Sequence, residues 1–188
     1  MSEEQRALRI DEQGVASAAR FIASPNFDER PPGIQPSLLV LHNISLPPGV
    51  FAGPAVIDLF TNSIDYRAHP FFEGLRGQRV SAHFLIRRDG ELIQFVACAR
   101  RAWHAGSSRW RGRPRCNDFS IGIELEGSDT VAYESPQYFQ LARLTRALQA
   151  RYPLSETVGH ADVAPDRKSD PGPSFDWARH RADLADPR

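Results

Sequence analysis

The residues that this chain offers for catalysis are histidines and carboxylates at scattered positions. The sequence contains no GxSxG elbow, Walker loop, GxGxxG or HExxH pattern. A catalytic zinc needs three protein ligands, for which imidazole and carboxylate are suitable, and one open position. His42 at a predicted strand end, His160 after a glycine and Asp170 in a stiff Asp-Pro-Gly loop are suitable ligand types. The alternative is that both histidines are polar residues with satisfied hydrogen bonds and no metal.

The remaining four histidines compete for the same role. His180 falls on a predicted terminal helix and His69 precedes a proline, so both are expected at the surface. His83 and His104 are expected to line a cleft.

A carboxylate for acid–base chemistry is offered by the segment 121–126, IGIELE. In a strand, Glu124 and Glu126 share the face opposite the three apolar residues. A partly buried glutamate is costly unless it is paired, and its pKa tends to rise, which suits a general base. The competing interpretation is an edge strand with one solvated face.

Arginine supplies almost all of the positive charge. The chain has 22 arginines and one lysine, Lys168, which indicates a place where a compact ammonium is needed or simply chance. Residues 92–117 contain six arginines and no acidic residue, with Trp103 and Trp110 among them. Such a segment suits carboxylates next to a sugar or peptide. Single-stranded nucleic acid and a merely solvated basic loop are the alternatives.

These residues must be positioned by a mixed set of strands and helices. The apolar run 37–42 predicts a buried strand, residues 80–96 a hairpin with Asp89-Gly90 as its turn, and 157–160 an edge-like strand. Helices are predicted around 55–60, over 136–152 with Ser135 as its cap, and over 175–184. We therefore expect an α+β fold in which a mixed β-sheet is flanked by helices and the site lies in a surface cleft.

Composition excludes several classes of protein. The 188 residues suit one domain, 1–188 with a core of about 20–185, and the net charge is zero, which disfavours nucleic acid and anionic membranes as partners. The N-terminus has no apolar run that would indicate a secretory signal, so a cytoplasmic location is expected. Cys98 and Cys116, without CxxC spacing, are expected to be reduced thiols, although this pair could form a disulfide.

Several long segments resemble the zinc-dependent N-acetylmuramoyl-L-alanine amidases, specifically the cytoplasmic branch that acts on 1,6-anhydro-muramyl peptides. Its fold is shared with peptidoglycan recognition proteins. The resemblance covers about residues 20–185. The segments that carry it are HNISLPPG (42–49), VSAH (80–83), RAWHAG (101–106), CNDFSIGIELEG (116–127) and APDRKSDPGP (164–173).

The resemblance implies a role for each matching residue. His42, His160 and Asp170 would bind Zn²⁺, Glu124 would be the general base, and Lys168 would stabilise the oxyanion. The peptide stem and sugar would be bound by a further set: Asn43, Arg79, Trp103 and Arg115. The segment 161–163, ADV, departs slightly from the family pattern without affecting a ligand.

The expected function is hydrolysis of the amide bond between the lactyl group of 1,6-anhydro-N-acetylmuramic acid and L-alanine, in peptidoglycan recycling. The expected partner is a small muropeptide, with no nucleic acid or membrane partner, and the chain is expected to be a monomer. A non-catalytic peptidoglycan-binding module is the first alternative, and it predicts a missing zinc ligand. A secreted amidase acting on intact wall is the second, and it requires an export signal.

Overall fold

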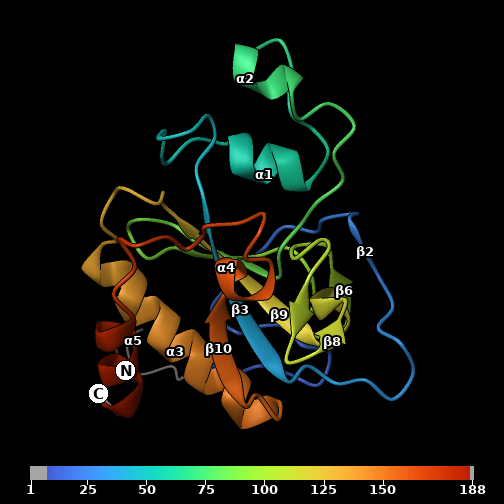
Figure 1. Ribbon diagram of the computed structural model, residues 1–188, viewed down its shortest axis with the longest axis vertical. Helices are drawn as coiled ribbons and strands as arrows, with labels where there is room; N and C mark the ends of the chain where they lie inside the picture. Colours follow the sequence, from blue (N-terminus) through green and yellow to red (C-terminus); the bar gives the residue numbers. More distant parts are fainter. Residues whose placement is uncertain (1–7, 187–188) are drawn as a thin grey trace.

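A six-stranded mixed sheet forms the centre of the computed structural model, which describes residues 8–186 (Figure 1). The strand order is β1-β5-β4-β9-β3-β10, so β10 lies at one edge beside β3. Most neighbouring strands are parallel, and β4 pairs antiparallel with β5. The bounds are β1 (Arg20–Phe21), β3 (Leu38–Ile44), β4 (Phe84–Ile86), β5 (Leu92–Gln94), β9 (Ser120–Glu126) and β10 (Glu156–Gly159).

The two long strands, β3 and β9, pair along seven residues in the middle of the sheet. All of β9 is buried, and β3 is buried from Leu38 to His42. Strands covered on both faces are expected to be nearly continuously apolar. The polar residues His42, Glu124 and Glu126 break that rule, and all three lie toward the carboxyl ends of these strands.

One face of the sheet is covered by helix α3 (Ser135–Arg151), against which α5 (Trp177–Ala185) packs (Figure 1). Leu141, Leu144 and Leu148 of α3 are fully buried, which confirms the predicted apolar stripe. Each such leucine contributes about 1.5–3 kcal/mol through burial. The cap is one residue earlier than predicted, because the backbone N–H of Glu134 donates to Gln137 Oε1 (3.0 Å) at the helix start.

The opposite face carries the loops and short elements around the site. Helices α1 (Ala55–Phe60) and α2 (Pro70–Glu73) lie together beyond one end of the sheet (Figure 1). The remaining short elements are β2 (Phe27–Asp28), β6 (Arg101–Ala102), β7 (Arg109–Trp110), β8 (Arg113–Pro114), the 3₁₀ turn η2 (Cys116–Asp118) and α4 (His160–Val163).

The predicted elements are confirmed with shifted ends. The hairpin at 80–96 is present as β4 and β5, each only three residues long, and the helix at 55–60 has the predicted bounds. The edge-like strand at 157–160 is β10, whose last residue is Gly159. Within residues 8–186, no helix combines the length and apolar character needed to cross a bilayer.

Candidate active site

Three side chains converge where β3 and β10 end. The two strands are parallel and pair up to Leu41 and Gly159, so the next residues, His42 and His160, lie side by side. Their Nδ1 atoms are 2.9 Å apart, and each is 3.1 Å from Asp170 Oδ2. His42 and His160 are 2% and 3% exposed, so these polar groups have been removed from water together.

This group fits a metal ion. A tetrahedral zinc bound at about 2.0–2.2 Å separates its ligand atoms by roughly 3.3 Å, and the observed spacings are slightly shorter. The donor set of two imidazoles and one carboxylate contains no thiolate, and a bound ion would keep one coordination position for water or substrate. The fold therefore brings together the three side chains that were predicted as ligands.

Charge at the three side chains is also suitable for metal binding. Burial lowers the pKa of His42 to about 4, so its imidazole is neutral at pH 7. Burial of Asp170 favours the protonated acid, but its close contacts with His160 and His42 outweigh this effect and hold the pKa of Asp170 below its usual range. The arrangement thus offers a carboxylate beside a neutral His42, as a cation requires.

Glu124 lies beside this group on the neighbouring strand. It pairs in register with His42, and only 8% of it is exposed. Its Oε2 atom has no hydrogen-bond partner among the described residues. Burial, followed by the charge of Asp170, raises the pKa of Glu124 well above its usual value. A carboxylate with a raised pKa accepts a proton more readily than an exposed glutamate does.

Glu126, two residues further along the same face, differs from Glu124 because both of its carboxylate oxygens accept hydrogen bonds. Its Oε1 accepts a hydrogen bond from Arg87 (2.8 Å) and from the backbone N–H of Ala52 (2.7 Å). Its Oε2 accepts from the backbone N–H of Arg88 (3.2 Å). The edge-strand alternative is therefore wrong for both glutamates, since β9 is an interior strand and both are buried.

A cavity of about 450 Å³ opens over the three predicted ligands and Glu124. Lys168 is exposed on the loop between α4 and Asp170, and it lines this cavity. The positive charge of Lys168 stabilises the ionised form of Glu124 and so lowers its pKa, against the effect of burial. Other lining residues are Asn43, Ile44, Leu46, Leu59, Phe60, Phe71, Leu75, Gln78, Val80, Ser81, Trp103, His104, Arg167 and Ser169.

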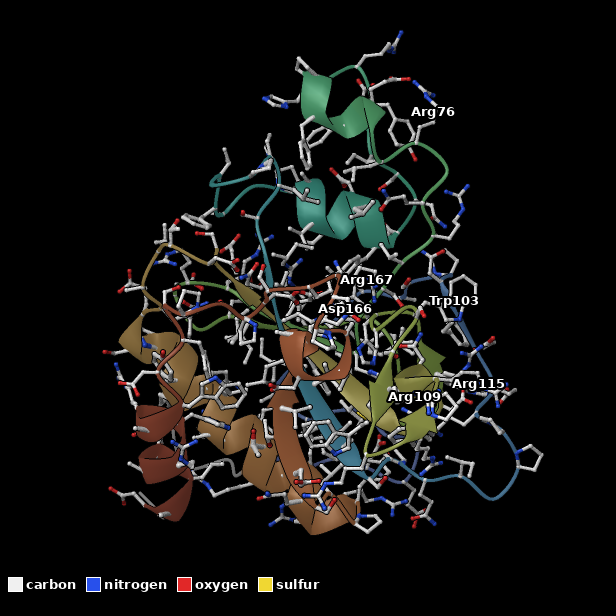
Figure 2. All side chains as sticks on the ribbon, in the orientation of Figure 1. Arg76, Trp103, Arg109, Arg115, Asp166 and Arg167 are labelled. Carbon is white, nitrogen blue, oxygen red and sulfur yellow. The ribbon has the colours of Figure 1, made fainter. Side chains whose placement is uncertain are left out.

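The predicted substrate-binding residues divide into two pairs. Asn43 and Trp103 line the cavity, and the Asn43 side chain donates to Asp129 Oδ1 (2.7 Å). Arg79 and Arg115 are exposed and are not part of its lining. Figure 2 shows Arg115 with Arg109 on the flank of the molecule that carries the β7–β8 hairpin. The structure therefore does not bring these two arginines to the predicted metal ligands.

The arginine-rich segment is largely neutralised by acidic residues from elsewhere in the chain. Arg101 forms a two-pronged pair with Asp28 (2.7 Å for each bond). Arg111 pairs with Glu156 (2.7 Å), Arg115 with Asp118 (3.0 Å) and Arg100 with Glu29. These ion pairs leave fewer arginines of the segment available to bind the carboxylates of a substrate or a nucleic acid.

The other histidines differ from expectation in two cases. His69 is exposed as predicted, and its Nδ1 accepts from the backbone N–H of Phe71 at the start of α2. His180 is 1% exposed, so the surface prediction for it is wrong; it packs against the aromatic rings of Phe175 and Trp177. His83 is fully buried and does not line the cavity.

His104 does line the cavity, in agreement with the prediction. Burial, followed by the neighbouring histidines, lowers its pKa well below the usual value, so its ring is neutral. The sequence pattern does not single out Asn117, yet its Oδ1 accepts from the backbone N–H groups of His104 (3.2 Å) and Ala105 (2.8 Å). Its position just before a buried strand was the available signal.

Comparison with known proteins gives a consistent family. The family model described as N-acetylmuramoyl-L-alanine amidase matches residues 32–173. The 1,6-anhydro-N-acetylmuramyl-L-alanine amidase AmpD of Citrobacter freundii is 60% identical over 173 residues, which are 91% of this chain and 92% of that protein. A crystal structure of a selenomethionine AmpD derivative superposes with a TM-score of 0.90 at 59% identity, covering 92% of this chain and 98% of the other.

A more distant solved structure contains a ligand. It is the N-acetylmuramyl-L-alanine amidase AmiD from Escherichia coli, described as a complex with the substrate anhydro-N-acetylmuramic acid-L-Ala-D-gamma-Glu-L-Lys. Its TM-score is 0.58 at 29% identity, and the match covers 84% of this chain and 65% of that one.

Proposed function

This chain belongs to the N-acetylmuramoyl-L-alanine amidase family, and on that basis we propose that it is a zinc-dependent amidase for 1,6-anhydro-muramyl peptides. The bond cleaved joins the lactyl group of 1,6-anhydro-N-acetylmuramic acid to L-alanine. The proposal includes a place in the recycling of wall fragments, in the cytoplasm and as a monomer.

One observation carries the catalytic part of the proposal. Glu124, whose buried Oε2 has no hydrogen-bond partner among the described residues, lies in the same cavity as His42, His160 and Asp170, whose ligand atoms are within hydrogen-bond distance of one another. A buried carboxylate oxygen without a partner is destabilising for the fold, which indicates that Glu124 has a chemical role. A binding module would not need this group.

His42, His160 and Asp170 would hold the zinc. When bound, zinc lowers the pKa of a coordinated water and polarises the substrate carbonyl. Glu124 takes a proton from the attacking water and delivers it to the amine of the departing L-alanine. Its raised pKa helps the first step, because a more basic carboxylate takes up the proton of the water more readily.

Lys168 acts on the carbonyl oxygen of the scissile amide. Negative charge develops on this oxygen as the tetrahedral species forms, and the Lys168 ammonium, at the cavity, donates to it. The position suits a lysine because a compact charge on a flexible stem can follow the oxygen. This role also accounts for the retention of one lysine in a chain that otherwise uses arginine.

Substrate choice is supported by the relatives and by two residues of the cavity. The C. freundii protein is named for its anhydro-muramyl substrate, and the E. coli AmiD complex holds an anhydro-muramyl tripeptide. In this chain, Trp103 would provide an apolar wall for the sugar and Asn43 a polar contact. Arg79 and Arg115 would contact the free carboxylates of the peptide stem, which extends out of the cavity.

The test compares two substrates on the purified protein, together with its metal content. The first is a soluble anhydro-muropeptide and the second is the same peptide with a reduced, ring-opened muramic end. We expect a markedly higher kcat/KM for the anhydro form and poor activity on polymeric wall. Equal kcat/KM values would leave only a general muramyl-peptide amidase.

A further inference from the structure

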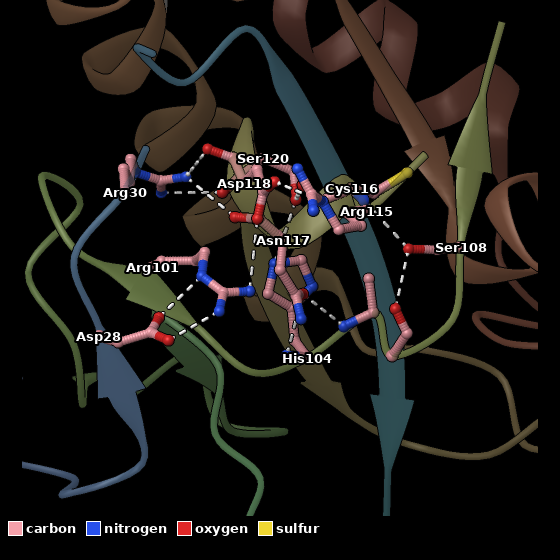
Figure 3. A network of polar contacts seen from close by, with 12 residues as sticks. Asp28, Arg30, Arg101, His104, Ser108, Arg115, Cys116, Asn117, Asp118 and Ser120 are labelled. Carbon is pink, nitrogen blue, oxygen red and sulfur yellow. Dashed lines mark hydrogen bonds and ion pairs between the residues drawn. The ribbon is translucent and has the colours of Figure 1, made fainter. Parts of the chain in front are cut away.

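A chain of hydrogen bonds leads from His42 away from the predicted metal position. His42 Nε2 lies 2.9 Å from His104 Nδ1, and His104 Nε2 lies 3.2 Å from Ser120 Oγ. Ser120 Oγ in turn donates to the backbone carbonyl of Cys116, at 2.6 Å. His104, Ser120 and Cys116 are seen together in Figure 3.

The direction of every bond in this chain follows from its last acceptor. A carbonyl oxygen has no proton to give, so the Ser120 hydroxyl must donate to Cys116. The only proton of that hydroxyl is then used, and its oxygen accepts from His104 Nε2–H. A neutral His104 consequently has its lone pair on Nδ1, which accepts from His42 Nε2–H. The lone pair of neutral His42 is left on Nδ1, the atom that faces His160 and Asp170.

Without these hydrogen bonds, His42 would favour the tautomer that carries its proton on Nδ1. Asp170 Oδ2 lies 3.1 Å from His42 Nδ1, and a carboxylate at that distance attracts a proton onto this nitrogen. A proton on Nδ1 would occupy the lone pair that a metal needs. The bonds through His104 oppose this by stabilising the proton on Nε2.

The same short segment also orients the second histidine. The carbonyl of Ala105, next in sequence to His104, lies 3.2 Å from His160 Nε2 and accepts its proton. Asn117 holds the backbone of both residues through its side-chain oxygen (Figure 3). One dipeptide therefore directs Nδ1 of both imidazoles toward the same point.

The sheet is shaped to receive the His104 ring. Gly122 of β9 lies directly beneath it, and a Cβ on this glycine would be 2.4 Å from His104 Cγ. Contacts this short are excluded, so any other residue here would displace the ring. The ring stands edge-on to His42, with centroids 5.1 Å apart and planes at 87°.

We propose that His104 is a positioning residue that fixes His42 as the Nε2–H tautomer, through Ser120 and the Cys116 carbonyl, so that Nδ1 is free for the metal. The inference rests on the proposed zinc site. His104 touches neither substrate nor ion in this role. Partners of this kind typically change metal affinity 10–100-fold when they are removed.

The experiment measures zinc affinity by competition with a chromophoric chelator, together with ring ¹⁵N–¹H spectra of the zinc-loaded protein. His104→Phe keeps a ring but removes both nitrogens, and we expect zinc binding about 10–100-fold weaker. The hydrogen-bonded His42 Nε2–H resonance should broaden or shift upfield, while that of His160 stays. His104→Gln, which carries one acceptor and one donor, should restore much of the affinity.

His180→Phe is the matched control, because His180 is also buried and neither of its nitrogens has a partner among the described residues. Its zinc affinity should equal that of the wild type. If His104→Phe does not fold, Ser120→Ala is the deciding variant. It removes the hydroxyl that fixes the direction of the hydrogen bonds and leaves the His104 ring in place. Unchanged zinc affinity and an unchanged His42 resonance in whichever variant folds would overturn the inference. A wild-type protein that takes up no zinc overturns the proposed function instead.

Discussion

His42 and Glu124 lie directly opposite each other on the neighbouring parallel strands β3 and β9. Residues in register on adjacent strands project from the same face of a sheet. The predicted metal ligand and the predicted base are therefore placed by backbone pairing between two buried strands, rather than by a loop.

Metal dependence is the first expectation. The purified protein should contain about one zinc per chain, and removal by a strong chelator should abolish amidase activity. His42→Ala should lose both metal and activity, whereas His180→Ala should keep both. Metal analysis and turnover of an anhydro-muropeptide measure this, and full activity in metal-free protein contradicts it.

Loss of the Glu124 base should reduce kcat without removing the metal. Glu124→Gln keeps the shape of the side chain but cannot accept the water's proton, so kcat should fall by about 100-fold or more with zinc retained. The control is Glu126→Gln on the same face of β9, which breaks a buried pair with Arg87. That control should lower the free energy of unfolding by about 3–5 kcal/mol while leaving kcat near wild type.

Replacement of Lys168 tests oxyanion stabilisation. Lys168→Ala should cut kcat by roughly 10²–10³-fold at unchanged zinc content. Lys168→Arg should also be poorly active, because a planar guanidinium does not reproduce a compact ammonium. A silent Lys168→Arg exchange would show that this residue is an ordinary surface charge.

Substrate contacts outside the cavity should appear in KM. Arg115→Ala should raise KM about tenfold at nearly constant kcat, since a charged hydrogen bond to the stem contributes about 1.5–3 kcal/mol in ground and transition state alike. Arg109→Ala on the same flank is the control, because Arg109 donates locally to the Gly112 carbonyl (2.7 Å). If both variants behave alike, Arg115 does not bind substrate.

Acid sensitivity of the fold is expected from His180. Burial lowers the pKa of His180 to about 4; Asp183 opposes this shift and Arg181 adds to it. The folded state thus binds the proton less tightly than the unfolded chain, whose histidine titrates near 6.5. Stability from this residue is complete above pH 6.5 and is lost as the pH falls toward 4, by at most about 3 kcal/mol.

The variant His180→Phe should remove that part of the pH dependence. Urea unfolding of wild type and variant at several pH values between 7 and 4 measures it. A wild-type stability loss that is identical in His180→Phe would assign the acid sensitivity to other groups.

Local pattern predicts most of the fold and part of the site. The apolar runs around Leu38 and Ile121 and the Asp89-Gly90 turn specify strands through short-range chemistry, so these elements were predictable. The ion pair between Arg101 and Asp28 was not predictable, because its partners are 73 residues apart and no local signal records such contacts. Burial of His180 depends on the packing of α5 against α3, a contact between distant segments that local pattern does not record either.

For the three predicted metal ligands, too, local sequence predicts one part and long-range contacts determine the other. Local sequence selects the three side chains: His42 ends a predicted strand, His160 follows a glycine and Asp170 precedes Pro-Gly. Their meeting depends on the parallel pairing of β3 with β10, which the sequence does not state. The hydrogen bonds of His104 and Asn117 are also not recorded by local pattern, since they join residues 12 or more positions apart.

Because β10 is an edge strand, one of the two imidazoles, that of His160, directly follows a strand that is paired on one side only. β10 has one neighbour, β3, whereas His42 lies on a strand with neighbours on both sides. Edge segments open locally at lower free-energy cost than central ones, and an ion that needs both histidines binds only the closed form. Zinc should therefore slow amide hydrogen exchange in β10 far more than in β9. The ion would secure the sheet's edge against local unfolding, so depletion of metal would expose a free strand edge to unwanted pairing with other chains.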